Sequence, residues 1–286
     1  MSITHSPLRY PGGKSILSPL LGNFIEINNL LDGIYIEPYA GGAGAALKLL
    51  FSEYVNEIIL NDADKSIFSF WYSILNHTED FIKLIYDTPV NLEEWDRQRY
   101  IFKNPSSFNT VQIGFSTFFL NRCNRSGILY AGPIGGQYQS GAWHLDVRFN
   151  KLNLEKKIEK IALYKSRISI FNKDALVFLE KYVKSFTIKN QKILVYLDPP
   201  YYSKGSQLYL NYYNHEDHVM LSKYILGQKK YKWIISYDDV PEIKALYNGL
   251  TKTVFSINYF VHRAKIGKEI IIYCPDCNIP NDALEN

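Results

Sequence analysis

The feature that most constrains the fold is a rhythm of apolar strands, turns and helices that runs through both ends of the chain but stops between residues 67 and 164. Strands are predicted at Ile34–Glu37, Ile58–Leu60, Ile168–Phe171, Ile193–Leu197, Trp233–Tyr237, Val254–Phe260 and Glu269–Tyr273. A glycine cluster and a helical stretch ending near Ser52 follow the first strand, and another helix is expected over Ala175–Val183. This alternation predicts a mostly parallel sheet covered by helices.

The two strands predicted last are joined only by the polar link His262–Lys268. This link is too short for the crossover helix that parallel strands need, so it predicts an antiparallel hairpin at one edge of the sheet. The predicted fold class is therefore α/β, with the sheet formed by residues 1–66 and 165–286. Residues 67–164 are predicted to form a mainly helical inserted domain that becomes rich in glycine toward its end.

Composition limits the classes of protein to consider. The 286 residues are 47% hydrophobic and 21% charged, as in ordinary globular proteins. A net charge of +4 suits a nucleic-acid partner without requiring one. Three cysteines cannot build a disulfide framework, which favours the cytoplasm. No apolar run approaches the ~20 residues of a membrane span, so no membrane partner is expected.

The most specific short motif is Asp198-Pro199-Pro200-Tyr201, directly after an apolar strand. Two consecutive prolines remove two backbone donors and fix φ, so the chain leaves the strand rigidly. The Asp198 carboxylate and the Pro199 carbonyl are then acceptors suited to an amine with two N–H bonds. Such hydrogen bonds would draw the nitrogen lone pair out of ring conjugation and prepare it to attack a sulfonium methyl. Tyr201 offers a face for a stacked base, worth ~1–3 kcal/mol. A rigid turn without chemistry is the alternative.

Three predicted strands end in an acidic residue: Glu37, Asp62 or Asp198. In open α/β sheets, ligands bind beyond the carboxyl ends of the strands, where these side chains would lie. Gly41 and Gly44 follow the first strand and let the backbone approach a ligand closely. An acid in the place of Asp62 reaches ribose hydroxyls in nucleotide-binding folds. Simple packing of a helix on a strand is the alternative explanation for the glycines.

Four motifs together carry a resemblance to a known family: Arg9-Tyr10-Pro11-Gly12-Gly13-Lys14, Glu37-Pro38-Tyr39-Ala40-Gly41-Gly42, Asn61-Asp62 and Asp198-Pro199-Pro200-Tyr201. In this order they resemble the Dam-type, or alpha-group, adenine-specific DNA methyltransferases, over nearly the whole chain. The resemblance implies a Rossmann-like S-adenosylmethionine-dependent methyltransferase fold. It also implies methyl transfer from S-adenosylmethionine to N6 of an adenine flipped out of duplex DNA, by a catalytic domain of residues 1–66 and 165–286.

The resemblance also implies roles for individual residues. The catalytic residues would be Asp198, Pro199, Pro200 and Tyr201. The residues that bind S-adenosylmethionine would be Tyr10, Lys14, Glu37, Pro38, Tyr39, Gly41, Gly44, Asp62, Asp174 and Asp198. Asp174 is placed by position near the cofactor adenine, although an acid at a helix N-terminus is often only a cap. No metal is implied.

The inserted segment resembles the DNA-recognition region of the same family. Its expected DNA-binding residues are Asn121, Arg122, Arg125, Ser126, Tyr130 and Arg148. Family members that recognise GATC carry Tyr-Asn where this chain has Arg125-Ser126, and a base-reading Arg where it has Tyr130. Because specificity depends on individual side chains at base edges, GATC is not carried over. The expected partners are double-stranded DNA, S-adenosylmethionine and, as a candidate, a cognate restriction endonuclease of the same system.

Other interpretations remain open at this point. A methyltransferase that acts on RNA adenine or on a protein glutamine amide would use a similar acid/amide–Pro–Pro–aromatic motif. An NAD-dependent dehydrogenase is disfavoured because the G-x-G-x-x-G spacing is absent. A DNA-binding protein without catalysis is disfavoured because the catalytic motif is complete. Cys274 and Cys277 have the spacing of half a zinc site without a second pair, and His215 and His218 are predicted on a helix surface.

Overall fold

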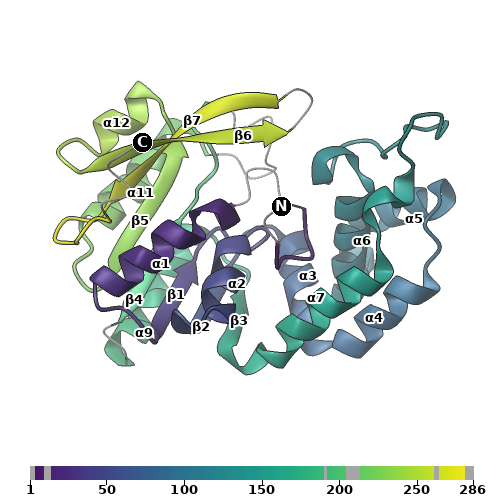
Figure 1. Cartoon of the computed structure of the whole chain (residues 1–286), viewed down its shortest axis with the longest axis horizontal. Helices are drawn as coiled ribbons and strands as arrows, with labels where there is room; N and C mark the ends of the chain where they lie inside the picture. Colours follow the sequence, from purple (N-terminus) through teal and green to yellow (C-terminus); the bar gives the residue numbers. More distant parts are fainter. Residues whose placement is uncertain (1–3, 10–13, 190–191, 204–212, 261–263, 281–286) are drawn as a thin grey trace. The chain divides into compact units, whose positions relative to one another are not determined.

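The computed structural model describes residues 4–9, 14–189, 192–203, 213–260 and 264–280 and divides into two compact units. Residues 1–13 and 64–170 form what we call the helical unit, and residues 14–63 and 171–286 form the sheet unit. The helical unit contains the segment 67–164, in which the sequence predicted an inserted domain, and it also takes in the N-terminal residues (Figure 1). The strand Ile168–Phe171 carries the boundary.

One seven-stranded sheet has the order β3-β2-β1-β4-β5-β7-β6 (Figure 1). Its strands are β1 (Gly33–Glu37), β2 (Val55–Asn61), β3 (Ile168–Phe171), β4 (Ile193–Leu197), β5 (Lys232–Asp238), β6 (Lys252–Phe260) and β7 (Ala264–Tyr273). β1 pairs in parallel with both β2 and β4, and β4 pairs in parallel with β5. β7 pairs antiparallel with both β5 and β6. The predicted α/β fold, with its antiparallel edge hairpin, is confirmed.

The order of the strands reverses at β1. The chain builds outward from β1 to β2 and β3 on one side, and from β4 to β5 on the other. Between β1 and β4 the connections therefore diverge, which is where open α/β sheets bind their ligands. Both strands are buried along their whole length, and each is followed by a predicted site motif. The sequence thus places Glu37 and Asp198 at the carboxyl ends of adjacent strands.

The helices of the sheet unit cover the strands. They are η1 (Lys14–Leu17), α1 (Ser18–Ile27), α2 (Gly44–Phe51), α8 (Ala175–Val177), η6 (Phe178–Val183), α9 (Lys184–Lys189), α11 (His215–Leu226) and α12 (Pro241–Leu246). In Figure 1, α1 and α2 lie across one face of the sheet. The helix predicted over Ala175–Val183 continues to Lys189, with one π-helical stretch, η6. α11 begins with a reciprocal capping box between Asn214 and Asp217, which satisfies two exposed backbone donors.

The helical unit has an aromatic core. Its elements are α3 (Lys65–Asn76), α4 (Thr78–Asp87), α5 (Leu92–Lys103), η2 (Pro105–Ser107), α6 (Thr110–Cys123), η3 (Arg125–Gly127), η4 (Leu145–Arg148), α7 (Lys151–Leu163) and η5 (Lys165–Arg167). Phe70, Phe81 and Phe118 are fully buried and meet ring to ring, each worth roughly 2 kcal/mol of burial. α6 approaches α3 closely because Gly114 has no side chain: a Cβ there would lie 2.5 Å from the Ser69 carbonyl oxygen.

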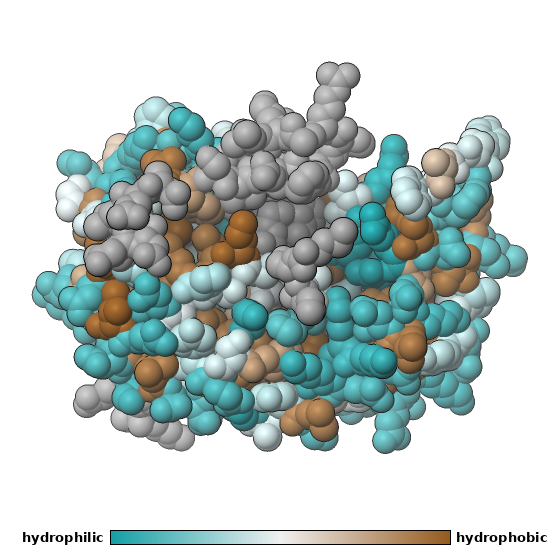
Figure 2. Space-filling model, viewed as in Figure 1, coloured by the Kyte–Doolittle hydropathy of each residue, from teal (hydrophilic) through white to brown (hydrophobic). Residues whose placement is uncertain are grey.

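The described surface is mixed in character. On the face drawn in Figure 2, apolar residues form small patches separated by hydrophilic ones. Within the described part of the chain, every helix is too short or too polar to span a lipid bilayer.

Candidate active site

The catalytic carboxylate predicted from the sequence lies directly after β4 and is held through one of its oxygens. Oδ1 of Asp198 accepts a hydrogen bond of 2.7 Å from the Ser236 hydroxyl of the neighbouring strand β5. The same oxygen lies 3.2 Å from the ammonium nitrogen of Lys14. Ser236 in turn lies 2.8 Å from the hydroxyl of Tyr196 in β4. The Asp198 side chain keeps 25% of its surface exposed, so it remains accessible to a ligand.

Lys14 and Tyr201 meet at a second carboxylate, that of Glu269 in β7. Oε2 of Glu269 accepts from the Lys14 ammonium at 2.8 Å, and Oε1 accepts from the Tyr201 hydroxyl at 2.5 Å. The Lys14 ammonium also lies 3.2 Å from the Tyr201 hydroxyl. Lys14, Tyr201 and Glu269 are all buried, and Glu269 completely so. The structure therefore brings together the first and last of the four sequence motifs, together with a residue that belongs to neither.

Opposing effects set the charge of this cluster. Burial raises the pKa of the Asp198 carboxyl above its ordinary value, while the adjacent Lys14 ammonium limits the rise. Burial alone would lower the pKa of Lys14, but the carboxylates of Asp198 and Glu269 outweigh it, and the net pKa is raised. Lys14 is thus a permanent cation between two carboxyl groups.

Glu37 is a buried acid that forms no salt bridge with any of the residues that the structure describes. Its side chain accepts a 3.0 Å hydrogen bond from the Tyr35 hydroxyl within β1. Burial raises the pKa of Glu37 to about 8; the Tyr35 hydrogen bond opposes this rise, and the charge of Asp198 adds to it. At neutral pH Glu37 is therefore largely protonated, and a positively charged ligand beside it would favour its ionised form.

The turn after the two prolines is fixed by a residue at the end of β5. The Asp238 carboxylate accepts from the backbone N–H of Tyr202 and of Ser203, both at 2.9 Å. It also accepts from the Ser203 hydroxyl at 2.5 Å. The catalytic tetrapeptide is therefore restrained on one side by the proline rings and on the other by these three hydrogen bonds.

The glycine segment after β1 is tied to the end of β2. The backbone N–H of Gly41 donates to Oδ2 of Asp62 at 2.9 Å, and Asn61 donates to the Pro38 carbonyl at 2.9 Å. Gly41 has φ +46°, a left-handed value that glycine adopts without strain. The segment leads into α2, which begins at Gly44 after Ala43, a residue whose side chain cannot cap the helix. In the first turn of α2, the Glu37 carboxyl accepts a hydrogen bond from the backbone N–H of Ala46.

These groups fit a ligand of mixed charge. The backbone N–H groups in the first turn of the eight-residue helix α2, one of which meets Glu37, are donors of the kind that bind a carboxylate. Glu37, Asp62 and Asp198 supply carboxyl groups for a cation and for hydroxyls. S-adenosylmethionine carries a carboxylate, an ammonium, a sulfonium and two ribose hydroxyls, so the donor set of this site matches its chemistry.

Three further residues predicted to bind the cofactor are held by hydrogen bonds within the protein. Tyr39 is half-buried next to Tyr213, with their hydroxyl oxygens 2.8 Å apart. Asp174 caps α8 by accepting from the backbone N–H of Val177 at 3.1 Å, the capping role that its position suggested. Pro38 carries the carbonyl that holds Asn61. Tyr10 lies outside the described residues.

Two of the predicted DNA-binding residues form the framework of the helical unit. The Asn121 side chain accepts from the backbone N–H of Arg9 at 2.7 Å and donates to the carbonyls of Arg9 and Gly127, both at 2.9 Å. It is buried and both ends of its amide are engaged, so a direct contact with DNA is disfavoured. Arg122 donates to the carbonyl oxygens of Arg148 and Pro7 and is only partly exposed.

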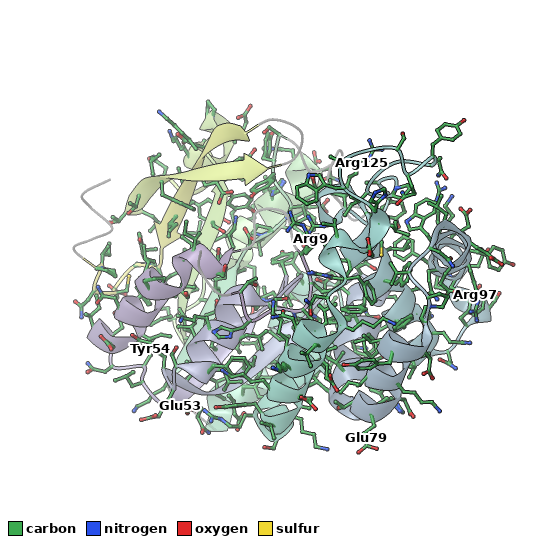
Figure 3. All side chains as sticks on the ribbon, turned by 45° about the vertical axis from the view of Figure 1, so that its right-hand side comes forward. Arg9, Glu53, Tyr54, Glu79, Arg97 and Arg125 are labelled. Atoms are coloured by element: carbon green, nitrogen blue, oxygen red, sulfur yellow. The ribbon has the colours of Figure 1, made fainter. Side chains whose placement is uncertain are left out.

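The remaining predicted DNA-binding residues lie toward the surface, on the segment after α6. Arg125 and Arg148 are exposed, and Tyr130 keeps 54% of its surface accessible. Ser126 adopts a left-handed φ of +57° beside Gly127, at φ +76°. A side chain at Gly127 would collide with the Arg9 carbonyl at 2.3 Å. Figure 3 labels Arg9 and Arg125, which this segment brings near each other through the contact of Arg9 with the Asn124 carbonyl.

The arginines here repel one another. Burial lowers the pKa of Arg122 to about 10, and the charges of Arg9 and Arg148 contribute to this. The pKa of Arg9 is likewise lowered by burial and then by Arg148. Cations gathered at this cost are characteristic of a surface that receives an anion, because a phosphate between them would relieve the repulsion.

Comparison with known families decides the class of protein. The family model for D12 class N6 adenine-specific DNA methyltransferases matches residues 10–265 of the chain. The chain belongs to this family. D12 methyltransferases methylate adenine in DNA at N6, and the motifs of the site described above all lie within or at the edge of the matched residues.

Individual relatives of this D12 methyltransferase are distant. The Type II methyltransferase M.CviBI of Paramecium bursaria Chlorella virus NC1A is 24% identical over 242 residues, which make up 82% of this chain and 85% of the viral protein. Two solved structures of the rRNA methyltransferase aviRa from Streptomyces viridochromogenes align over 93% and 92% of this chain and 86% of theirs. Their sequence identities are 10% and 9%, and their TM-scores are 0.38 and 0.37.

Sequence reasoning missed three residues of the D12 site: Ser236, Asp238 and Glu269. Ser236 had a detectable signal, because it is a polar residue inside an apolar run, and Glu269 is the acidic residue at the start of the last predicted strand. Asp238 follows a predicted strand, as Asp62 does, and was overlooked. The prediction of a surface position was wrong for His218, which is fully buried and lies 3.0 Å from the Tyr237 hydroxyl, whereas His215 is exposed. Cys274 and Cys277 are free thiols.

Proposed function

We propose that this D12 methyltransferase is a site-specific DNA-methyltransferase (adenine-specific) that uses S-adenosylmethionine and acts on an adenine flipped out of duplex DNA. The observation that supports the proposal is the position, hydrogen bonding and exposure of the Asp198 carboxylate. Its carboxylate is held through Oδ1 alone among the described residues, keeps 25% exposure and is followed by two prolines. Flipping is required because N6 cannot be reached inside the base stack, and it costs a few kcal/mol.

The chemistry of the adenine follows from the acceptors around it. One N–H of the amine would donate to the Asp198 carboxylate and the other to the Pro199 carbonyl, which turns the nitrogen lone pair away from the ring. S-adenosylmethionine supplies an activated methyl group on a sulfonium. The buried Tyr201 ring, fixed by its hydroxyl at Glu269, would form a rigid wall for the base, worth ~1–3 kcal/mol in stacking.

The proposed cofactor contacts are divided between the strand ends. Glu37, Pro38, Tyr39, Gly41 and Gly44 would surround the methionine part, where the positive end of the α2 dipole favours a carboxylate. Asp62 would receive the ribose hydroxyls. Asp174 would lie near the cofactor adenine, and Tyr10 of the N-terminal motif would also contact the cofactor, as the family resemblance implies.

For DNA we propose a division of labour within the helical unit. Arg125, Tyr130 and Arg148 are exposed and would contact the duplex, and the mutual repulsion of Arg9, Arg122 and Arg148 supports binding of phosphate there. Asn121 and Arg122 would hold the shape of this segment. A cognate restriction endonuclease as partner, and a location in the cytoplasm, stay predictions.

The test is transfer of tritiated methyl from S-adenosylmethionine to duplex DNA, with identification of the modified nucleoside by mass spectrometry. Asp198→Asn keeps the shape of the side chain but removes its charge and one acceptor. We expect its rate to fall at least about 10²–10³-fold, the usual effect of losing one electrostatic contact to a transition state. Normal methylation by Asp198→Asn would refute the mechanism. A wild-type preference for RNA or for protein over duplex DNA would refute the substrate.

A further inference from the structure

We infer that Glu269 is a positioning residue of the active site, which fixes Lys14 and Tyr201 against the catalytic Asp198. This inference rests on the proposed function and adds to it a residue outside the four motifs. Glu269 bridges the cluster with both carboxylate oxygens, one on the Lys14 ammonium and one on the Tyr201 hydroxyl. Through Lys14 it reaches Oδ1 of Asp198.

The sheet brings Glu269 to this place. β7 runs antiparallel to β5, and in that register Glu269 lies opposite Asp238, the residue that holds the turn after the prolines. The edge hairpin thus delivers a carboxylate to the end of the parallel strands. Glu269 is fully buried, and a buried acid is retained only where its partners are well placed.

The hydrogen bonds of Lys14 determine what Lys14 does. A lysine ammonium has three N–H donors and no acceptor. In this structure its three acceptors are Asp198 at 3.2 Å, Glu269 at 2.8 Å and Tyr201 at 3.2 Å. A direct hydrogen bond to the cofactor would require one of these to be released. The geometry therefore assigns Lys14 to holding the catalytic residues, in place of the cofactor contact that the motif implied.

The two partners act on Asp198 with opposite sign. The Lys14 cation favours the ionised carboxylate that must accept from the amine, whereas the Glu269 anion disfavours it. The hydroxyl of Ser236 also stabilises the ionised form. Removing Lys14 should therefore move the onset of activity to higher pH, and neutralising Glu269 should move it to lower pH.

Other titratable groups around Asp198 leave this contrast intact. Glu37 in β1 faces it and is largely protonated at neutral pH. Tyr35 and Tyr196 are fully buried, and their pKa values lie well above the ordinary value because of burial, so they stay neutral. The variants therefore differ from the wild type at Lys14 and Glu269, whose charges act on Asp198 with opposite sign.

The experiment measures the single-turnover rate of methyl transfer against pH, with saturating S-adenosylmethionine and duplex DNA, and the cofactor dissociation constant by calorimetry. The variants are Lys14→Met, Lys14→Arg, Glu269→Gln and Glu269→Asp. Glu26→Gln, which removes an exposed carboxyl on α1, makes the same change in net charge as Glu269→Gln and serves as its control. Circular dichroism confirms that each variant folds.

We expect the midpoint of the acidic limb of the pH–rate profile to move to higher pH by about one unit in Lys14→Met. In Glu269→Gln it should move to lower pH by a similar amount, as for a charge removed at short range. Lys14→Arg should restore the wild-type limb. Glu269→Asp keeps the charge but is too short to hold both partners, so its rate should fall at least tenfold while its limb stays near the wild-type position. If Glu269→Gln does not fold, Lys14→Met and Glu269→Asp carry the test.

Two outcomes would overturn the inference. The first is an acidic limb of the pH–rate profile that does not move, or that moves in the same direction in Lys14→Met and Glu269→Gln. Either result would show that Lys14 and Glu269 do not set the charge of Asp198. Weakened cofactor binding in Lys14→Met, with an unmoved limb and normal Glu269 variants, would make Lys14 a cofactor ligand. Failure of the proposed function is distinct, because Asp198→Asn would then remain active.

Discussion

The two predicted functional regions of the chain are held together in different ways. Around Asp198, side chains from distant strands bind one another, and most of the partners carry charge. At the end of α6 and in the segment after it, side chains bind mainly the backbone, and the Trp95 indole donates to the Asn124 side chain. Asn121 holds Arg9 and Gly127, and Asn124 donates to the carbonyls of Ile128 and Leu129.

This difference matches what each region has to do. A site that moves a methyl group needs charges of fixed sign and position, so its side chains must restrain each other. A surface that reads DNA needs a loop of fixed shape that carries exchangeable side chains. Because buried amides fix the loop, the exposed residues Arg125 and Tyr130 contribute little to its conformation. Sequence specificity can then change without rebuilding the loop.

The largest effect is expected for the buried carboxyl group of Glu37 in the sheet unit. Burial moves the pKa of Glu37 from 4.5 to about 8, so the folded protein holds a proton that the unfolded chain releases. The free energy of unfolding should therefore fall as pH rises from about 5 to about 8, by up to about 5 kcal/mol. Glu37→Gln should lack this fall and be the more stable protein at pH 9. Urea unfolding at several pH values measures it.

Glu26→Gln is the matched control, since it removes an exposed carboxyl from the same unit and should follow the wild type at every pH. If Glu37→Gln and the wild type lose stability in parallel, Glu37 is not held in its protonated form, and the contrast between the two regions weakens.

The next effect concerns the loop framework. Asn121→Ala removes three hydrogen bonds and leaves backbone groups of Arg9 and Gly127 without partners. We expect a loss of about 3 kcal/mol in the free energy of unfolding, with weakened DNA binding. Asn76→Ala removes one exposed amide on α3 and should cost under about 1 kcal/mol. Equal stability of the two variants would contradict a framework role for Asn121.

The smallest effect should come from the exposed cations. Arg125→Ala should reduce DNA affinity by about 1 kcal/mol, lower the salt dependence of binding by about one counterion, and leave the melting temperature unchanged. Arg97→Ala is the control, because Arg97 is exposed on α5 and labelled well apart from Arg125 in Figure 3. Titration of fluorescent duplex DNA at several salt concentrations measures both. Equal losses would place the duplex elsewhere on the helical unit.

The fold could be predicted from the sequence to a large extent. Each apolar run became a strand because both faces of a parallel sheet are covered, and the short link before Glu269 allowed only a hairpin. The boundaries were less predictable. β2 begins at Val55, three residues before the predicted start. The prediction began too late because the polar Asn56 and Glu57 interrupt the apolar run.

The site was predictable in part for a physical reason. Asp198 and Tyr201 lie together in a short rigid motif, which is visible locally. Glu269 functions only because β7 pairs with β5, and Asn121 is occupied only because Arg9 folds back onto α6. Such contacts between distant residues depend on how the strands and helices pack in the folded chain. The sequence therefore shows which residue is present but does not show which residue it contacts.

The Lys14–Glu269 ion pair joins residues that are 255 positions apart. During synthesis, the four motifs therefore emerge before the last strand can close the cluster, and until then Lys14 lacks the second of its two carboxylate partners. Contacts of such long range form late because they require most of the chain to be ordered first. The arrangement of Lys14 and Tyr201 around Glu269 should thus be completed only when β7 docks on β5.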